Sequence, residues 1–267
     1  MKDFLLYKKN YLNFLSQTPT FSKVWSTWSK KIKNELQPCN GENLFNIGDK
    51  MRAIFFETNK GRDQGGVSGG GTVWECFVTW YLNLIFWNTP IIAMRMSKKF
   101  VPKVLFNCVA VTIANNTSNT ESDILIFNVP NHETFKGSSA VDLNDFITQN
   151  IKNINLWIIQ CKTNWNENSQ VPMLWDLVYS SRTTRSNVSV GNNGFSPASL
   201  GDFRYAFVTC PTQKDLSRFK HNSVHVLRVK NLTGGNFWGT HTKPDIARSI
   251  KELPPTIYKD FLGGVSS

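Results

Sequence analysis

Acidic residues are scarce in this chain of 267 residues. It contains 19 Asp and Glu against 30 Lys and Arg, which gives a formal net charge of +11. This excess favours a polyanionic partner, nucleic acid ahead of an anionic membrane, although charge that merely aids solubility is the alternative. With 40% hydrophobic and 18% charged residues, the composition argues against long disordered regions.

Closely spaced cysteines are also absent. Without a CxxC pair, the sequence lacks the usual spacing of a zinc site. The odd number of cysteines, in a chain too large to need disulfides, predicts reduced thiols and a cytoplasmic protein. Asp3, Lys8 and Lys9 interrupt the first apolar stretch, so it does not resemble a signal peptide. The five cysteines are Cys39, Cys76, Cys108, Cys161 and Cys210.

No apolar run is suited to a membrane span. The best candidate, residues 73–94, contains Glu75, Asn83, Asn88 and Pro90, which are costly to place in lipid. We therefore expect no membrane partner but a buried helix ending near Asn88, followed by the extended segment IIAMRM. The preceding stretch GRDQGGVSGGG lacks the GxxxxGK[ST] pattern, so we expect no nucleotide cofactor.

Hydrophobic spacing predicts helices in several parts of the chain. Residues 1–40 would form an N-terminal helical appendage, and the buried helix would begin near Val73. The segment MRAIFFE fits either a helix or a strand. The other expected helices cover residues 2–16, 21–36, 141–151, 169–181 and 244–252.

Strands are expected where short runs of β-branched and aromatic residues lie between polar turns. The first two, joined by the polar turn NNTSNTES, would form a hairpin. The order of elements predicts one mixed α/β domain over residues 1–267, with a central mixed sheet flanked by helices. The expected strands cover residues 103–114, 123–129, 155–162, 203–210 and 224–230.

Two of the most apolar strands carry a charged residue at one end. Asp123 begins DILIFNV and Lys162 ends NLWIIQCK, with Gln160 two residues earlier on the same face of the strand. If the two strands are neighbours, these side chains meet at one end of the sheet. Carboxylates hold Mg²⁺, which activates water and polarises a phosphate, and a lysine stabilises the developing charge. The pattern therefore suggests phosphodiester hydrolysis.

A second carboxylate would be needed, and two candidates lie within apolar surroundings. Asp176 lies on the helix expected after Lys162, and Glu75 lies on the buried helix after the glycine-rich stretch. Each acid has a structural alternative. Asp176 could be an ordinary helix residue that faces solvent or a salt-bridge partner, and Glu75 could be an acid of the first helical turn that favours the helix dipole. Asp123 could likewise cap a turn, and Lys162 could be a solvated strand end.

The segment SDILIF, with Asp123, followed by WIIQCK, with Gln160 and Lys162, resembles the pattern of the PD-(D/E)XK nucleases, most of all type II restriction endonucleases. Members of that family have an Asp on one strand and (Glu/Gln/Asp)-x-Lys on a neighbouring strand. Many also have a Glu on the preceding helix, which is the place of Glu75. The resemblance covers residues 72–180, the expected catalytic core, and its motif is short.

The sequence departs from the family pattern at two positions. Ser122 stands where the family has Pro, and Gln160 stands where an acid is usual. Some members use Gln there, with the backbone carbonyl of the next residue, here Cys161, as another metal ligand. Members that cut CCGG-type and CCNGG-type sites instead move the acid to the next helix, where Asp176 lies. We favour the second arrangement.

The resemblance implies a Mg²⁺-dependent, site-specific endonuclease for double-stranded DNA, acting as a homodimer in a restriction–modification system. Asp123 and Asp176 would be the primary metal ligands, and Glu75 a ligand of a second metal or a supporting group. Two alternatives stay open: a structure-specific or repair nuclease with the same core, and a basic nucleic-acid-binding protein without catalysis. The residues with implied catalytic roles are Asp123, Lys162, Gln160, Asp176 and Glu75.

Two polar loops, residues 60–71 and 182–197, could contact DNA, because Arg can read guanine and Asn adenine. We expect residues 181–267 to recognise DNA and to complete the sheet. His221 and His225 lie four residues apart without further ligands, which favours ordinary surface histidines. The candidate DNA-binding residues are Lys60, Arg62, Gln64, Arg182, Arg185 and Asn187.

Overall fold

The computed structural model describes the parts of the chain that form the central sheet and most of its flanking helices. The helix expected at 169–181 lies outside these parts, as do Asp176 and the six candidate DNA-binding residues between 60 and 187. The described residues are 2–57, 67–97, 99–113, 116–119, 122–163, 188–210, 217, 219–239 and 246–263.

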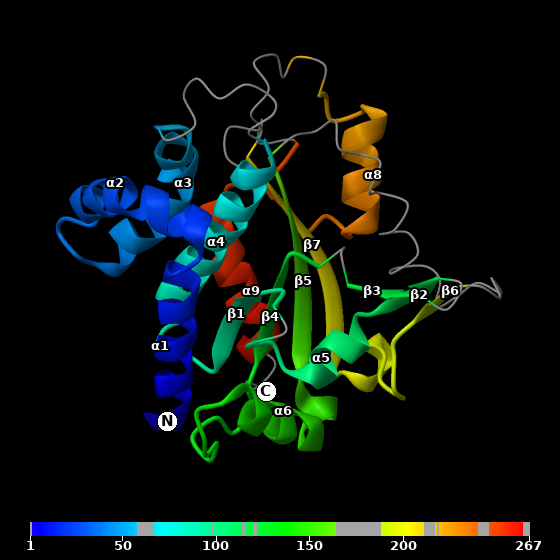
Figure 1. The fold of residues 1–267 in the computed structure, drawn as a ribbon. Helices are drawn as coiled ribbons and strands as arrows, with labels where there is room; N and C mark the ends of the chain where they lie inside the picture. The colour runs from blue at the N-terminus through cyan, green and yellow to red at the C-terminus, as the bar shows by residue number, and fades with distance from the viewer. Residues whose placement is uncertain are drawn as a thin grey trace.

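A five-stranded mixed sheet forms the centre of the protein, in the order β1-β4-β5-β7-β8 (Figure 1). β1, β4 and β5 are antiparallel to one another, whereas β7 and β8 run parallel to β5. This arrangement confirms the expected mixed α/β fold class. The strands are β1 (Ile91–Arg95), β4 (Ile124–Asn128), β5 (Asn155–Lys162), β7 (Asp202–Thr209) and β8 (Phe237–Gly239).

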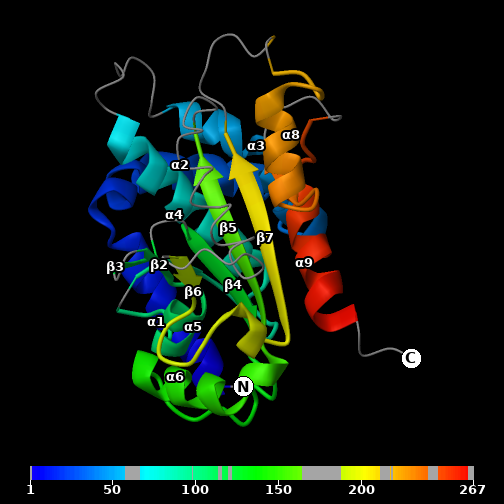
Figure 2. The same cartoon turned by 90° about the vertical axis from the view of Figure 1, so that its right-hand side faces the viewer.

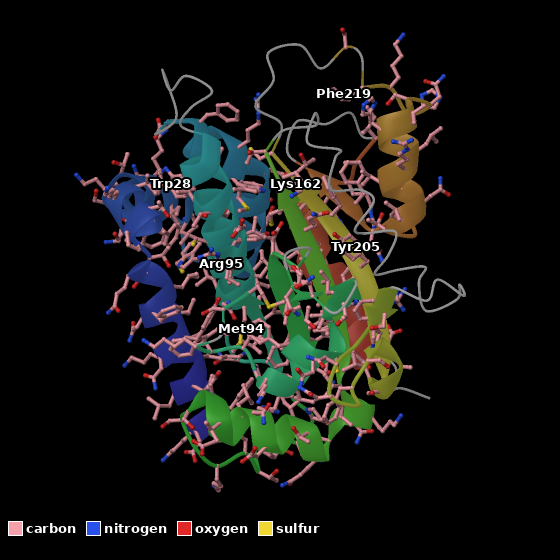
Figure 3. All side chains as sticks on the ribbon, turned by 45° about the vertical axis from the view of Figure 1, so that its right-hand side comes forward. Trp28, Met94, Arg95, Lys162, Tyr205 and Phe219 are labelled. Atoms are coloured by element: carbon pink, nitrogen blue, oxygen red, sulfur yellow. The ribbon has the colours of Figure 1, made fainter. Side chains whose placement is uncertain are left out.

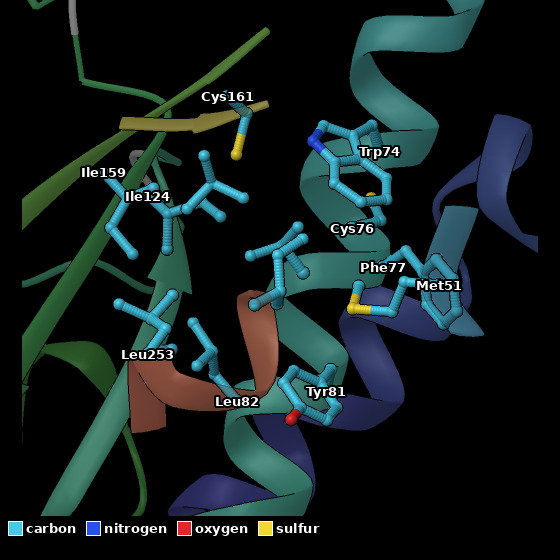
Figure 4. Close-up of a cluster of buried hydrophobic side chains, with 14 of the residues drawn as sticks. Met51, Trp74, Cys76, Phe77, Tyr81, Leu82, Ile124, Ile159, Cys161 and Leu253 are labelled. Carbon is cyan, nitrogen blue, oxygen red and sulfur yellow. The ribbon is translucent and has the colours of Figure 1, made fainter. Parts of the chain in front are cut away.

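Helices cover one face of the sheet through a large apolar cluster. Trp74 and Phe77 of the long helix α4 belong to this cluster, together with Ile124 and Ile159 of the sheet (Figure 4). Most of the helical residues in it come from α2 (Pro19–Glu35), α3 (Gly41–Glu57), α4 (Val67–Ile85) and α9 (Leu253–Leu262), and Leu15 near the end of the first helix also belongs to it. We call this side of the sheet the α4 face.

A second cluster covers the opposite face, which we call the Lys162 face because Lys162 alternates onto it. Leu125 and Ile158 of the sheet belong to this cluster, so β4 and β5 are buried on both sides. A small three-stranded sheet, β3-β2-β6, also contributes through Val111 and Val190. The helices here are α1 (Lys2–Ser16), α5 (Lys103–Cys108), α6 (Ala140–Gln149) and part of α8 (Val224–Leu232); the small strands are β2 (Val111–Ile113), β3 (Asn116–Ser118) and β6 (Val188–Val190).

Most expected elements are confirmed within a few residues. The helices expected at 2–16, 21–36 and 141–151 are α1, α2 and α6, and MRAIFFE is helical within α3. The first two helices bury aromatic residues in the same clusters as the sheet strands. No described helix is both long enough and apolar enough to cross a membrane.

The strand expected at 103–114 and its hairpin with 123–129 are wrong. Residues 103–108 form helix α5, and β2 pairs with β3 and β6, whereas β4 pairs with β1 and β5. Pro102 occupies the N-cap position of α5, and the buried residues Val104, Leu105 and Cys108 follow helical spacing. Because valine favours strands, the valines of this segment led to the expectation of a strand, whereas the buried residues of α5 follow the spacing of a helix.

The strand expected at 224–230 is also wrong, because this segment forms the helix α8. Its buried residues Val226, Val229 and Leu232 recur every three positions, whereas Val224 is 58% exposed. The helix expected at 244–252 lies further along the chain, as the short η6 (Ile250–Glu252) followed by α9. Prolines at the start of α9 suit the first turn of a helix, where no backbone N–H is required.

Lys8 connects α1 to the C-terminal end of α4. Its side chain is buried, and its Nζ donates hydrogen bonds to the carbonyls of Phe86 (2.7 Å), Trp87 (3.2 Å) and Thr89 (2.7 Å). Carbonyls at a helix C-terminus lack partners within the helix, and a cation there interacts favourably with the helix dipole. Burial lowers the pKa of Lys8 from 10.5 to about 7.

We predict that Lys8→Met lowers the free energy of unfolding by about 2 kcal/mol at pH 6, because buried carbonyls lose their donor. Since the pKa of Lys8 is lower in the folded than in the unfolded protein, the unfolded chain binds more protons from pH 7 to about 10. The wild type should therefore gain stability relative to Lys8→Met as the pH rises through this range. Urea unfolding at several pH values measures both effects.

The matched control is Lys9→Met, which removes an exposed lysine from the same helix. It should change the free energy of unfolding by less than about 0.5 kcal/mol. Equal losses of stability in the two variants would contradict the role assigned to Lys8.

Candidate active site

Asp123 directly precedes β4 and is held between two neighbouring strands. Its carboxylate Oδ2 accepts a hydrogen bond of 2.7 Å from the backbone N–H of Cys161 on β5. Its backbone carbonyl accepts another, of 3.0 Å, from the N–H of Met96, just after β1. The carboxylate therefore reaches across to β5, which argues against a role limited to capping the preceding turn.

Lys162 is the last residue of β5 and follows six buried residues. It is paired in register with Thr209 of β7, and its carbonyl accepts a hydrogen bond of 2.9 Å from Cys210 N–H. Figure 3 shows Lys162 at this end of the strand. The β4–β5 register, continued by one residue, sets Asp123 opposite Gln160. Asp123 and Lys162 thus lie at the same end of neighbouring strands, as the sequence predicts.

Gln160 lies on the Lys162 face and is only 1% exposed. Its Oε1 accepts a hydrogen bond of 2.8 Å from the hydroxyl of Tyr205 on β7, a partner that sequence reasoning missed. A buried amide needs such a partner, so this contact gives Gln160 a structural role between the two strands. It weakens the case for Gln160 as a metal ligand, whereas the other candidate, Asp176, lies outside the described residues.

Glu75 lies well inside α4, because the helix begins at Val67. The alternative that Glu75 is a helix-start acid is therefore wrong. Its Oε2 forms an ion pair of 2.8 Å with Nε of Arg95, and the two side chains are 18% and 26% exposed. The pair joins α4 to the end of β1. Such limited exposure strengthens the Coulomb attraction relative to a typical surface pair, while both groups lose part of their hydration.

Arg95 is the site residue that sequence reasoning missed. It ends the apolar strand IIAMR and pairs in register with Ile124, the residue after Asp123. Its backbone N–H donates a hydrogen bond of 2.7 Å to the hydroxyl of Tyr11, which α1 supplies. The available signal was a charged residue at the end of a buried strand, the same signal that identified Lys162.

Four charged residues act electrostatically on the buried thiol of Cys161. Cys161 points to the α4 face, opposite to its neighbours Gln160 and Lys162 (Figure 4). Burial is the main cause that raises its pKa. The carboxylates of Asp123 and Glu75 raise this pKa further, and the cations of Lys162 and Arg95 oppose them. We call Glu75, Arg95, Asp123 and Lys162 the charged cluster.

The carboxylates of the charged cluster are the kind of ligand that Mg²⁺ prefers. Asp123 and Glu75 are two such groups, and the backbone carbonyl of Cys161 was a third candidate. Within the part of the chain that the structure describes, no three His, Cys, Asp or Glu side chains lie together as a metal site would require. A carboxylate from outside the described residues would complete the set of metal ligands. The sequence analysis expects Asp176 to supply it.

The chain matches no protein-family model, and none of the curated proteins matches it. The interpretation of the charged cluster therefore depends on its own residues and their arrangement.

We predict that Asp123→Ala lowers the free energy of unfolding by about 1–2 kcal/mol, because the buried N–H of Cys161 loses its acceptor. Asp123→Asn keeps an oxygen at this position and should lower it by less than about 1 kcal/mol. Urea unfolding at neutral pH compares the two variants. Equal losses of stability in Asp123→Ala and Asp123→Asn would contradict the assignment, because the hydrogen bond from Cys161 N–H would then not be what stabilises the carboxylate of Asp123 in its position.

Proposed function

We propose that the protein is a Mg²⁺-dependent deoxyribonuclease similar to the type II restriction endonucleases. The observation that carries this proposal is the hydrogen bond from Cys161 N–H to Asp123, which joins the Asp-bearing and Lys-bearing strands at one end of the sheet. A carboxylate and a lysine at neighbouring strand ends are the central feature of the PD-(D/E)XK pattern. Glu75 on α4, the helix that packs beside β1, adds the third feature.

Each residue of the charged cluster has a role in this proposal. Asp123, with Asp176 and with Glu75 in support, would hold Mg²⁺, which when bound polarises the phosphate and lowers the pKa of a coordinated water. Lys162 stabilises negative charge that develops on the phosphate and positions the attacking water. Arg95 balances the charge of Glu75 and fixes its carboxylate beside the end of β1.

Double-stranded DNA is the proposed substrate, and the net charge of +11 favours such a polyanion. Cutting both strands at one site is achieved most simply by a symmetric homodimer on a palindromic sequence. Such an enzyme would serve a restriction–modification system. The proposal is tested against two alternatives. One is a structure-specific or repair nuclease with the same site, and the other is a basic nucleic-acid-binding protein without catalysis.

We predict that the purified protein cuts unmethylated phage DNA into discrete fragments in about 10 mM Mg²⁺, a concentration that saturates a weak magnesium site, and not in EDTA. Asp123→Asn and Lys162→Met should each reduce the cutting rate by at least about 100-fold, because they remove groups that act on the transition state. Gel electrophoresis of the digests measures fragment pattern and rate.

The matched control is Lys152→Met, an exposed lysine just before the other end of β5, which should cut at the wild-type rate. A Mg²⁺-dependent smear that needs Lys162 would favour the nuclease without sequence specificity. Salt-sensitive DNA binding without cutting on several DNAs would overturn the nuclease and leave the binding protein.

A further inference from the structure

Helix α8 lies beside the end of β7, on the Lys162 face of the sheet. Gln160 of β5 pairs in register with Phe207 of β7, and both side chains point to this face. Phe207 in turn packs in one apolar cluster with Phe219 and with Val226 and Val229 of α8. Figures 1 and 2 both show α8 next to the end of β7, where β5 also ends.

The outward side of α8 is basic. Lys220, His221, His225 and Arg228 are all exposed, and we call these four residues the α8 basic face. The surrounding residues 216–244 contain five Lys or Arg and no Asp or Glu. On the other side of the protein, some of the lysines have acidic partners, as in Lys31–Glu57 and Lys251–Asp49. Among the described ion pairs, none includes Lys220 or Arg228.

This arrangement of charge does not stabilise α8. The positive end of a helix dipole favours acidic side chains in the first turn, and α8 has none there. Instead, the charged side chain of Lys220 lies just before the helix. Cations at this end lower helix stability unless an anion approaches, so the pattern suits an anionic partner.

We propose that the α8 basic face binds the phosphate backbone of duplex DNA and holds the duplex near the end of β5 that carries Lys162. This inference rests on the proposed function, because that function supplies the duplex substrate. Contacts to phosphates position DNA without reading its sequence. A membrane surface fits less well, since Val226, Val229 and Leu232 face inward and leave only Val224 and Leu227 as exposed apolar side chains on α8.

The test is DNA binding by the double variant Lys220→Gln/Arg228→Gln. A fluorescent duplex of about 20 base pairs, two helical turns, is titrated with protein in EDTA, and anisotropy is followed at several salt concentrations. We expect affinity about 10- to 30-fold weaker than that of the wild type at 0.15 M salt, and a salt-dependence slope that is smaller by about 2. Cutting at limiting DNA should slow by a similar factor.

The control is Lys30→Gln/Lys33→Gln, which removes the same charge from exposed positions of α2, on the α4 face. We expect the affinity of this variant for DNA to lie within about 2-fold of the wild-type affinity, because Lys30 and Lys33 would make no direct contact with the duplex. Equal weakening in both double variants would overturn the proposal, since general charge would then explain the binding. Thermal unfolding confirms that each variant is folded.

Further outcomes separate this inference from the proposed function. A wild type that never cuts, but whose binding depends on Lys220 and Arg228, would overturn the nuclease and support the α8 contact. A wild type that cuts, with unchanged binding by the α8 variant, would overturn the α8 contact alone. Anionic phospholipid vesicles are the second probe: α8-dependent binding to them, with unchanged binding to the duplex, would overturn the proposal in favour of a membrane.

Discussion

The burial of β5 on both faces is the constraint on which the rest of the architecture depends. β5 forms backbone hydrogen bonds with β4 on one side and β7 on the other, and apolar clusters cover both its faces. A strand in that position must be apolar almost throughout. Its polar side chains therefore need specific partners or must lie at its end. Gln160 meets the first condition through Tyr205, and Lys162 meets the second.

The N-terminal helix supports the charged cluster from a distance in sequence. The hydroxyl of Tyr11 accepts a hydrogen bond from the backbone N–H of Arg95, and Lys8 binds carbonyls of the turn that follows α4. These two contacts fix the strand that carries Arg95 and the helix that carries Glu75. Residues 1–40, which the sequence suggests are an appendage, thus contact both elements that supply the Glu75–Arg95 ion pair.

The sequence predicts the elements whose period is unambiguous. β5 was expected at its observed bounds, because an uninterrupted apolar run between polar segments suits a fully buried strand. α8 was mistaken for a strand because its alternating valines fit a period of two, whereas burial follows a period of three to four. Local sequence cannot decide between these periods when the packing partners, here Phe207 and Phe219, are distant or outside the segment.

For the site, Asp123 and Lys162 could be predicted because each ends a buried strand. The pairing of Glu75 with Arg95 could not, because it depends on how α4 lies against β1. The same applies to Tyr205, whose hydroxyl meets Gln160 only through the parallel pairing of β5 with β7. Long-range registers of this kind are properties of the folded chain, and single segments carry little information about them.

The burial of Cys161 has a consequence for the reactivity of its sulfur. Burial and two nearby carboxylates raise its pKa well above the usual value, so the sulfur stays a neutral thiol at physiological pH. The thiolate, and not the neutral thiol, is the form that reacts with oxidants. The burial that packs β5 against α4 therefore also protects this sulfur from oxidation.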